Sequence, residues 1–461
     1  MSGKMDEGVE VILSTLKSLG EELISSPWWV PQLVIDFITP SVVQKHVKTT
    51  QSKLAELSDK DLLSYHVMVD HSKIMAMELM NKLFDLVYYA GKLEQLPFIP
   101  SKMIQLTLTH GMSPHSPLAF VLFGNCTALI DQNYEVGYHY VKLGLALMKQ
   151  SPSRVYDCKI LLNSAYTRLL VEPMQTTVEV FLDAFKAAMK SGDTREAMKC
   201  ANIYDVSCFW AGMKLDEVTK SMEVTIKQMR FHKNIVFISL MLPIVRLALR
   251  MVGELVIPQQ NSLTSVFGET HDEEDIADKS PSVMVARYYT KSYESFIFRE
   301  FDKAKENAEM FFSLNLNSSS GVILYHRVFY LGLISFWIGR ESKDKRWIAR
   351  GVESKNSIEE LARLASTWNF ENKMYLLQAE EQFSALNFDN AAKLYDDAIL
   401  SSKNHKFVNE EALANELAGN FYLDTGRKFK SLQYFCQAEE KYRKWGAVTK
   451  ADELANYLRS S

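Results

Sequence analysis

Apolar side chains recur at helical spacing along almost the whole chain. Between Leu377 and Leu400 they form two stripes interrupted at Asn387–Asp389, which is the pattern of two helices joined by a tight turn. Alternation of apolar and polar residues over the length of a strand is hard to find anywhere. Glycine and proline, at 19 and 12 of 461 residues, are also scarcer than in average proteins. The sequence therefore predicts an all-α protein.

The helix pairs repeat along the chain. In the tetratricopeptide framework, small residues let the two helices of a pair approach closely, and a large aromatic fills the gap to the next pair. Two consecutive C-terminal pairs carry such residues at packing positions: Ala379, Ala391, Tyr395, Ala398, then Gly419, Tyr422, Gly426 and Ala438. Weaker copies include Tyr134, Gly137 and Gly144. Because one pair cannot bury its apolar face alone, we expect a tetratricopeptide-like α-solenoid of stacked antiparallel helix pairs.

Breaks in the helical pattern divide the chain into four parts. We expect an N-terminal helical segment over residues 1–100, helical repeats over 101–255 and C-terminal tetratricopeptide-like repeats over 283–461. Residues 256–282 lie between the two sets of repeats. They carry the acidic run Asp272–Asp275 and show no periodicity, which is typical of a flexible surface loop.

Composition narrows the location and the partners. The net charge of −4 offers no basic field for nucleic acid. The five cysteines include no C-x-x-C pair and suit free thiols in a reducing compartment. The most apolar stretches, 234–245 and 328–339, are each twelve residues without a charge, whereas a membrane-spanning helix needs about 20. We expect a cytoplasmic protein with no membrane span and no nucleic-acid partner.

Motifs for catalysis are missing from the sequence. Around Gly91, Leu86 and Leu93 stand where a phosphate-binding loop needs glycine and serine or threonine. Neither G-x-G-x-x-G nor G-x-S-x-G occurs. His66 and His71 are five residues apart, whereas a zinc-binding helix needs a spacing of four. We therefore expect no enzymatic activity, no catalytic residue, no cofactor and no metal site.

Two groups of residues are candidates for contact with a partner. If the inner groove follows tetratricopeptide geometry, then Lys373, Glu380, Glu416 and Asn420 face it. A second, locally basic stretch fits either a contact patch or an ordinary exposed helix. It consists of Arg340, Lys343, Lys345, Arg346 and Arg350, against Glu341 and Asp344.

Several stretches also resemble a known family. They are NEEALANELAGNFYL at 409–423 with YRKWGA at 442–447, and GMSPHSPLA at 111–119. These resemble the helical-repeat region of large multidomain signalling proteins of bacteria and some eukaryotic microbes. In that family a serine/threonine kinase-like domain and an AAA-type ATPase precede the array, and GAF, histidine kinase or nucleotide cyclase modules often follow it. The likeness runs in order over nearly the whole chain.

The family's kinase and ATPase motifs do not occur in this sequence, so the resemblance implies only the role of the array. That role is a non-enzymatic scaffold or sensor segment for protein–protein interaction in signal transduction, with kinase or ATPase modules among its partners. A regulatory subunit acting in trans on an ATPase, kinase or nucleotide cyclase is the alternative. An all-α enzyme with an unrecognised site is a third reading.

Overall fold

The computed structural model describes residues 2–21, 40–89, 92–150, 156–253, 280–314 and 324–460. Every regular element in these ranges is a helix, apart from an isolated bridge between Val67 and Met112. This confirms the predicted all-α class. The predicted acidic loop falls outside the described residues over 256–279, and its last two residues already belong to a helix that begins at Pro281.

The chain divides into two compact units. Unit 1 comprises Met1–Arg168 with Lys186–Gly192, and unit 2 comprises Leu169–Phe185 with Asp193–Ser461. The helices of unit 1 are α1 (Ser2–Ser18), α2 (Pro40–Ala55), α3 (Asp59–Leu63), α4 (His71–Tyr89), the short 3₁₀ helix η2 (Leu93–Gln95), α5 (Phe98–His110), α6 (Ser116–Leu129) and α7 (Tyr134–Gln150). α8 (Asp157–Val171) and α10 (Glu179–Ser191) have residues in both units, and α9 (Met174–Thr177) lies between them in the chain.

Glycines let α6 and α7 pack closely in unit 1. A Cβ added at Gly124 would lie 2.5 Å from the Gly137 carbonyl oxygen, and one added at Gly137 would lie 2.5 Å from the Gly124 carbonyl oxygen. Two turns further along α7, a Cβ at Gly144 would lie 2.6 Å from Val121. Only glycine permits backbones to approach this closely. The weak repeat copy at Gly137 and Gly144 thus marks a helix pair.

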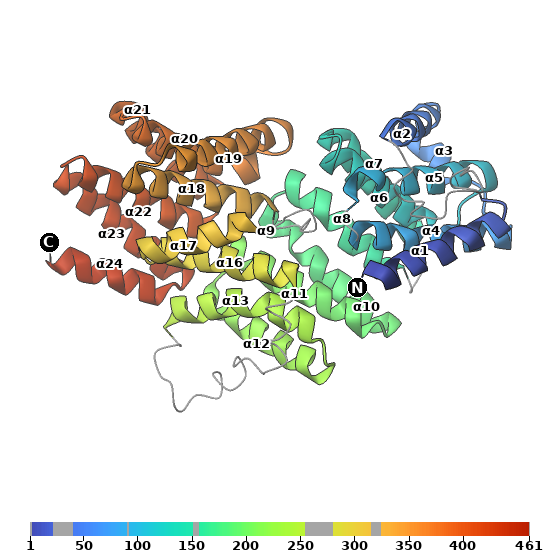
Figure 1. Ribbon diagram of the computed structural model, residues 1–461, viewed down its shortest axis with the longest axis horizontal. Helices are drawn as coiled ribbons and strands as arrows, with labels where there is room; N and C mark the ends of the chain where they lie inside the picture. Colours follow the sequence, from blue (N-terminus) through green and yellow to red (C-terminus); the bar gives the residue numbers. More distant parts are fainter. Residues whose placement is uncertain are drawn as a thin grey trace. The chain divides into compact units, whose positions relative to one another are not determined.

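Unit 2 is a stack of antiparallel helix pairs (Figure 1). Its first helices are α11 (Thr194–Trp210), α12 (Leu215–Phe231) and α13 (Ile235–Val252). Four pairs follow, α16 (Pro281–Ile297) with α17 (Phe301–Ser313), α18 (Leu324–Ser342) with α19 (Lys345–Leu364), α20 (Thr367–Ser384) with α21 (Phe388–Asn404), and α22 (Val408–Asp424) with α23 (Lys428–Trp445). α24 (Val448–Ser460) packs on α23. The structure thus confirms a tetratricopeptide-like solenoid.

Residues at the predicted packing positions lie between these helices. Ala379, Ala391, Tyr395, Ala398, Tyr422 and Ala438 are buried. A Cβ at Gly419 would lie 2.6 Å from the Phe435 ring, so glycine makes room for an aromatic of the paired helix. Gly426 lies in the turn after α22, where its φ of 77° suits glycine. The turn predicted at Asn387–Asp389 is found slightly earlier, at residues 385–387, and Phe388 and Asp389 already begin α21.

α13 is long and apolar enough, by length and composition, to cross a membrane. Its apolar run continues past Arg246 and Arg250 to Val252, so it is longer than the stretch seen in the sequence. Within unit 2, 56% of this helix is buried, and it packs against α11, α12, α16 and α24. Burial in the core of unit 2 accounts for the composition of the helix.

Substitution of Gly137 tests the close contact in unit 1. We expect Gly137→Ala to lower the free energy of unfolding by about 1–3 kcal/mol, because the new methyl group overpacks against the α6 backbone. Gly8→Ala is the matched control, since a Cβ there meets only Leu86 at an ordinary 3.6 Å, and alanine favours a helix. Urea unfolding of both variants measures the difference. Equal stability of the two variants would contradict the close contact.

Candidate functional site

α22 is buried on every face although it is rich in acidic residues. All positions from Asn409 to Gly419 are buried, among them Glu410, Glu411 and Glu416. A charge taken out of water is costly unless it is paired and hydrogen-bonded. The partners of these carboxylates therefore decide how the helices around α22 fit together.

Glu410 lies at the centre of one buried network. Lys373 Nζ of α20 lies 2.7 Å from Glu410 Oε2, and both side chains are at most 1% exposed. Asn372 also donates to Glu410, and Lys373 donates to the carbonyl oxygen of Asn369 at 2.8 Å. Burial lowers the pKa of Lys373, and the charge of Glu410 opposes this shift. The pair links the first helices of two consecutive repeats.

Two further ion pairs have the same arrangement. Arg340 of α18 lies 2.6 Å from Glu380 of α20, and Lys450 of α24 lies 2.6 Å from Glu416 of α22. Tyrosine hydroxyls complete both sites: Tyr395 donates to Glu380 at 2.6 Å and Tyr442 donates to Glu416 at 2.7 Å. With Lys373–Glu410, these pairs join α18 to α20, α20 to α22 and α22 to α24. We call these three pairs the ion-pair ladder.

Earlier segments of unit 2 cover the inner face of these repeats. Trp210 of α11 packs against Tyr293 and Tyr330, with ring centroids 5.1 Å apart in both cases. Asn409 donates to the carbonyl oxygen of Trp210 at 3.3 Å, and Trp445 Nε1 donates to that of Met213 at 2.9 Å. The end of α11 and the turn after it therefore contact α22 and α23 through residues 199 and 232 positions apart in the chain.

A third contact covers the start of α20. Asn369 donates to the carbonyl oxygens of Leu169 and Glu172, and its own side-chain oxygen accepts from the backbone N–H of Met174. These hydrogen bonds hold residues 169–174 against the start of α20. The side-chain amide of Asn369 uses both its N–H donors and its oxygen acceptor in them.

The residues predicted to face a partner groove lie in this interior. Lys373, Glu380 and Glu416 are nearly fully buried and belong to the ion-pair ladder. Asn420 is half-buried and donates to the Glu416 carbonyl oxygen at 2.9 Å. Contact of a partner with the three charged residues would require the interior to open, and their role in a groove stays a prediction.

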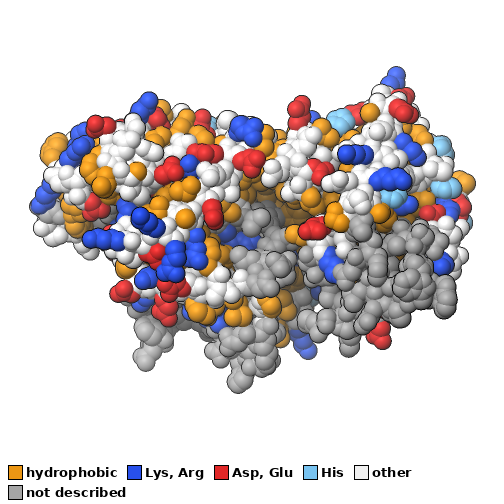
Figure 2. Space-filling model, turned by 45° about the horizontal axis from the view of Figure 1, so that its top comes forward, with side chains coloured by type: hydrophobic (Ala, Val, Ile, Leu, Met, Phe, Trp, Pro, Cys, Tyr) orange, Lys and Arg blue, Asp and Glu red, His pale blue; other side chains and the backbone are white. Residues whose placement is uncertain are grey.

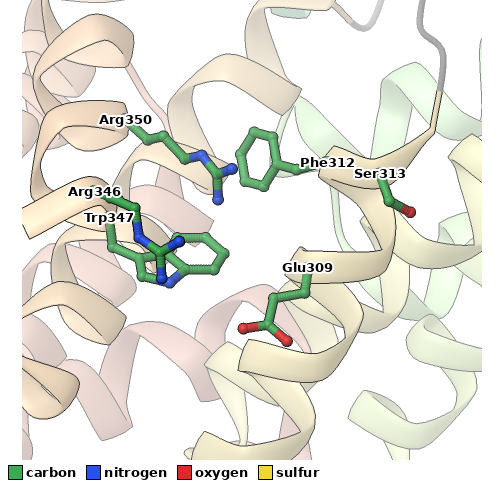
Figure 3. Close-up of a pocket in the computed structure, with 6 residues that line it drawn as sticks. All are labelled: Glu309, Phe312, Ser313, Arg346, Trp347 and Arg350. Atoms are coloured by element: carbon green, nitrogen blue, oxygen red, sulfur yellow. The ribbon is translucent and has the colours of Figure 1, made fainter. Parts of the chain in front are cut away.

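A surface pocket of about 260 Å³ lies between α17 and α19 (Figure 3). Glu309, Phe312 and Ser313 line it from α17, and Arg346, Trp347 and Arg350 line it from α19. The guanidinium of Arg350 lies 4.3 Å from the ring centroid of Phe312 and 4.7 Å from that of Trp347. Two aromatic rings therefore hold this cation in place.

The second arginine of the pocket is paired with an acid of its own helix. Arg346 Nη2 lies 2.8 Å from Asp344 Oδ2, and the Arg346 side chain is 87% exposed. Asp344 also accepts from the backbone N–H of Arg346 and so caps α19. Hydrogen bonding to Arg346 lowers the pKa of Asp344, and the same contact raises the pKa of Arg346. Glu309 points towards this arginine (Figure 3).

The structure separates the basic stretch found in the sequence into three parts. Arg340 belongs to the buried ladder, Arg346 and Arg350 line the pocket, and Lys343 and Lys345 are exposed. The sequence indicated a basic patch here, but it held no signal for the aromatic support from Phe312 of the preceding pair. On the face that Figure 2 shows, acidic and basic side chains are interspersed.

Groups suited to covalent or metal chemistry are few in the described part of the chain. No cluster of three or more His, Cys, Asp or Glu residues there has the geometry to hold a metal ion. None of the five cysteines, all of which lie in the described residues, forms a disulfide, and Cys436 alone among them is exposed. Burial raises the pKa of the Cys208 thiol to about 12, so this thiol stays protonated and is a poor nucleophile at neutral pH.

Comparison with known proteins gives weak similarities. No family model matches the chain. No curated protein matches it either. Among solved structures, a Rap protein complexed with competence and sporulation factor is 9% identical, covering 88% of this chain and 99% of its own, with a TM-score of 0.37. The apo form of RapI is 11% identical, covering 88% and 96%, with a TM-score of 0.31. The TPR domain of P58(IPK) is 12% identical, covering 90% and 98%, with a TM-score of 0.17.

A double-mutant cycle tests the ion-pair ladder. We expect Lys373→Met to lower the free energy of unfolding by about 3–5 kcal/mol, because Glu410 is left charged and unpaired in the interior. Adding Glu410→Gln should recover a large part of that loss, which a cycle reports as a coupling energy. The control is Lys227→Met, whose exposed pair with Glu223 is worth about 0–1 kcal/mol. Equal losses in Lys373→Met and Lys227→Met would contradict the ladder.

One buried acid has no basic partner close by. Asp205 of α11 is 0% exposed, accepts from the Ser221 hydroxyl at 2.5 Å, and its Oδ2 has no hydrogen-bond partner in the described part of the chain. Burial raises the pKa of this carboxyl from 3.8 to about 6.

This shift predicts a pH dependence of stability. Between pH 3.8 and about 6 the folded protein keeps a proton that the unfolded chain has released. The contribution of Asp205 to stability therefore falls as pH rises through this window, by about 3 kcal/mol at 1.36 kcal/mol per pKa unit. Urea unfolding at pH 4 and pH 7 should show that Asp205→Asn gains stability relative to the wild type at the higher pH. A difference between the two proteins that does not change with pH would refute this prediction.

Proposed function

We propose that this chain is a non-enzymatic helical-repeat protein that binds a protein partner in signal transduction, as a scaffold or sensor segment. The observation that carries the proposal is the accessible α17–α19 pocket, in which Arg350 is supported by Phe312 and Trp347 on a stack of helix pairs. Arginine and aromatic residues are enriched where proteins bind one another, and repeat stacks provide extended surfaces for such contacts.

The charged residues of the first helices are buried, so we place the partner contact on α17 and α19, the second helices of their pairs. Lys373, Glu380 and Glu416 are already paired within unit 2, so a partner gains little from them unless it first breaks the ladder. Arg350, in contrast, has no acidic partner in the described part of the chain, and its side chain reaches the surface. A partner that contacts Arg350 therefore has no ion pair of that residue to break, although Arg346 beside it is paired with Asp344.

The signalling role rests on the resemblance of residues 409–423, 442–447 and 111–119 to the repeat region of multidomain signalling proteins. Kinase or ATPase modules are the partners that this resemblance favours. Five cysteines that form no disulfide support a cytoplasmic location. The alternative is a regulatory subunit that acts in trans on an ATPase, kinase or nucleotide cyclase, which differs from a scaffold in changing the turnover of its partner.

Affinity capture with the full chain tests the proposal. We expect a partner that is retained saturably, that crosslinks to α17 or α19, and whose retention falls by about tenfold or more in Arg350→Gln, since a lost charge-assisted contact is worth about 1.5–3 kcal/mol. Arg363→Gln is the matched control, because Arg363 is an exposed arginine of α19 that does not line the pocket. Turnover of a captured enzyme, with and without the chain, separates a scaffold from a regulatory subunit.

Two results would count against the proposal. One is the absence of any saturable protein partner. The other is retention that is unchanged in Arg350→Gln while crosslinks form elsewhere. Melting curves of Arg350→Gln and Arg363→Gln that match the wild type would show that both variants are folded.

A further inference from the structure

We propose that the α17–α19 pocket recognises a carboxylate, supplied by an aspartate or glutamate side chain in an acidic peptide segment of the partner. This inference rests on the proposed function and names the chemistry of the partner. The pocket volume of about 260 Å³ suits one side chain rather than a folded element. The contact is thus an anchor point within a larger interface.

Arg350 is prepared to receive an anion. The rings of Phe312 and Trp347 lie 4.3 and 4.7 Å from its guanidinium carbon and fix its position. No carboxylate pairs with its N–H groups in the described ranges, and the side chain is half-buried rather than fully hydrated. A guanidinium offers two parallel N–H donors along one edge, which match the two oxygens of a carboxylate.

Two of the other arginines of unit 2 that lie over aromatic rings pair with carboxylates, whereas Arg299, 4.3 Å from the Trp337 ring, has no such ion pair among the described residues. Arg250 lies 3.7 Å from the Phe298 ring, and it pairs with Glu294 at 2.7 Å and with Glu300 at 2.9 Å. Arg340 lies 4.3 Å from the Phe383 ring and pairs with Glu380 at 2.6 Å. In both cases an aromatic ring packs on the guanidinium and a carboxylate pairs with its N–H groups. Arg350 has the aromatic support but no carboxylate on its N–H groups among the described residues. A ligand carboxylate would bind those N–H groups.

The charges around the pocket favour one negative charge over two. Arg346 is already paired with Asp344, so it adds little free positive charge. The Glu309 carboxylate lines the opposite wall and points towards Arg346 (Figure 3). A phosphoryl group carries about −1.5 to −2 charges at neutral pH and would be repelled by Glu309 more strongly than a carboxylate is. We therefore choose an acidic peptide over a phosphopeptide.

Fluorescence anisotropy with the full chain tests the inference. The probes are fluorescein-labelled hexaglutamate, hexaglutamine and a hexamer with one phosphoserine among glutamines. We expect saturable binding of hexaglutamate that weakens by about tenfold or more in Arg350→Gln, and weakens in Arg350→Lys because the paired donors are lost. Binding should also weaken as salt rises, since the contact lies at the surface. Arg363→Gln should bind hexaglutamate as the wild type does.

The same titration is repeated with Asp272, Glu273, Glu274 and Asp275 changed to asparagine or glutamine, as a control for competition by the chain's own acidic side chains. Tighter hexaglutamate binding in that background, still dependent on Arg350, supports the carboxylate site. Equal binding of hexaglutamine, tighter binding of the phosphoserine peptide, or an Arg350→Gln variant that binds like Arg363→Gln would each overturn it.

The two proposals fail in different ways. A partner captured through α17 and α19 that binds through neutral residues would overturn the carboxylate site and leave the proposed function intact. Hexaglutamate that binds at Arg350, with no protein partner retained in the capture experiment, would support the carboxylate site and count against the proposed function.

Discussion

The ion-pair ladder is the interaction on which the arrangement of unit 2 depends. Each of its pairs joins the first helix of one repeat to the first helix of the next, over 34–40 positions, which is about the length of one repeat. Each pair therefore fixes where one first helix lies along the next, although the three pairs use different positions along their helices. An apolar interface tolerates small shifts of one helix along another, whereas a buried carboxylate that loses its cation is left uncompensated. The ladder selects one position of each first helix along the next. The apolar packing around the ladder supplies most of the favourable free energy of folding.

The ladder also explains why the inner face is covered. Ion pairs exposed to water contribute little, because solvent screens them and their side chains stay mobile. Here Trp210, Asn409 and Trp445 bring α11 and the turn after it against α22 and α23, which removes water from the pairs. The tyrosines that donate to Glu380 and Glu416 satisfy further acceptor positions of these carboxylates. Excluding water thus strengthens the ion pairs, and pairing offsets the cost of burying their charges.

Much of the fold could be predicted from the sequence, because small residues, turns and apolar stripes are local signals. The pair around Asn387–Asp389 and the close contact at Gly419 are examples. The sequence could not tell that Lys373, Glu380 and Glu416 are buried, because a charged residue on one helical face reads as exposed until its partner is known. Those partners lie 34–40 positions away, and the residues that cover them lie about 200 positions away. The support of Arg350 by Phe312 was missed for the same reason.

The closed interior changes where recognition takes place. In an open repeat stack the first helices line a groove, and their polar side chains meet the ligand. In unit 2 the equivalent side chains already bind one another, so the same chemistry remains for a partner at an arginine such as Arg350, which has aromatic support and no paired carboxylate among the described residues. Arg340 and Arg350 are ten residues apart. Arg340 pairs with Glu380, whereas Arg350 has aromatic support but no paired carboxylate among the described residues. The buried pair thus serves as an internal model for the contact that we propose at the surface.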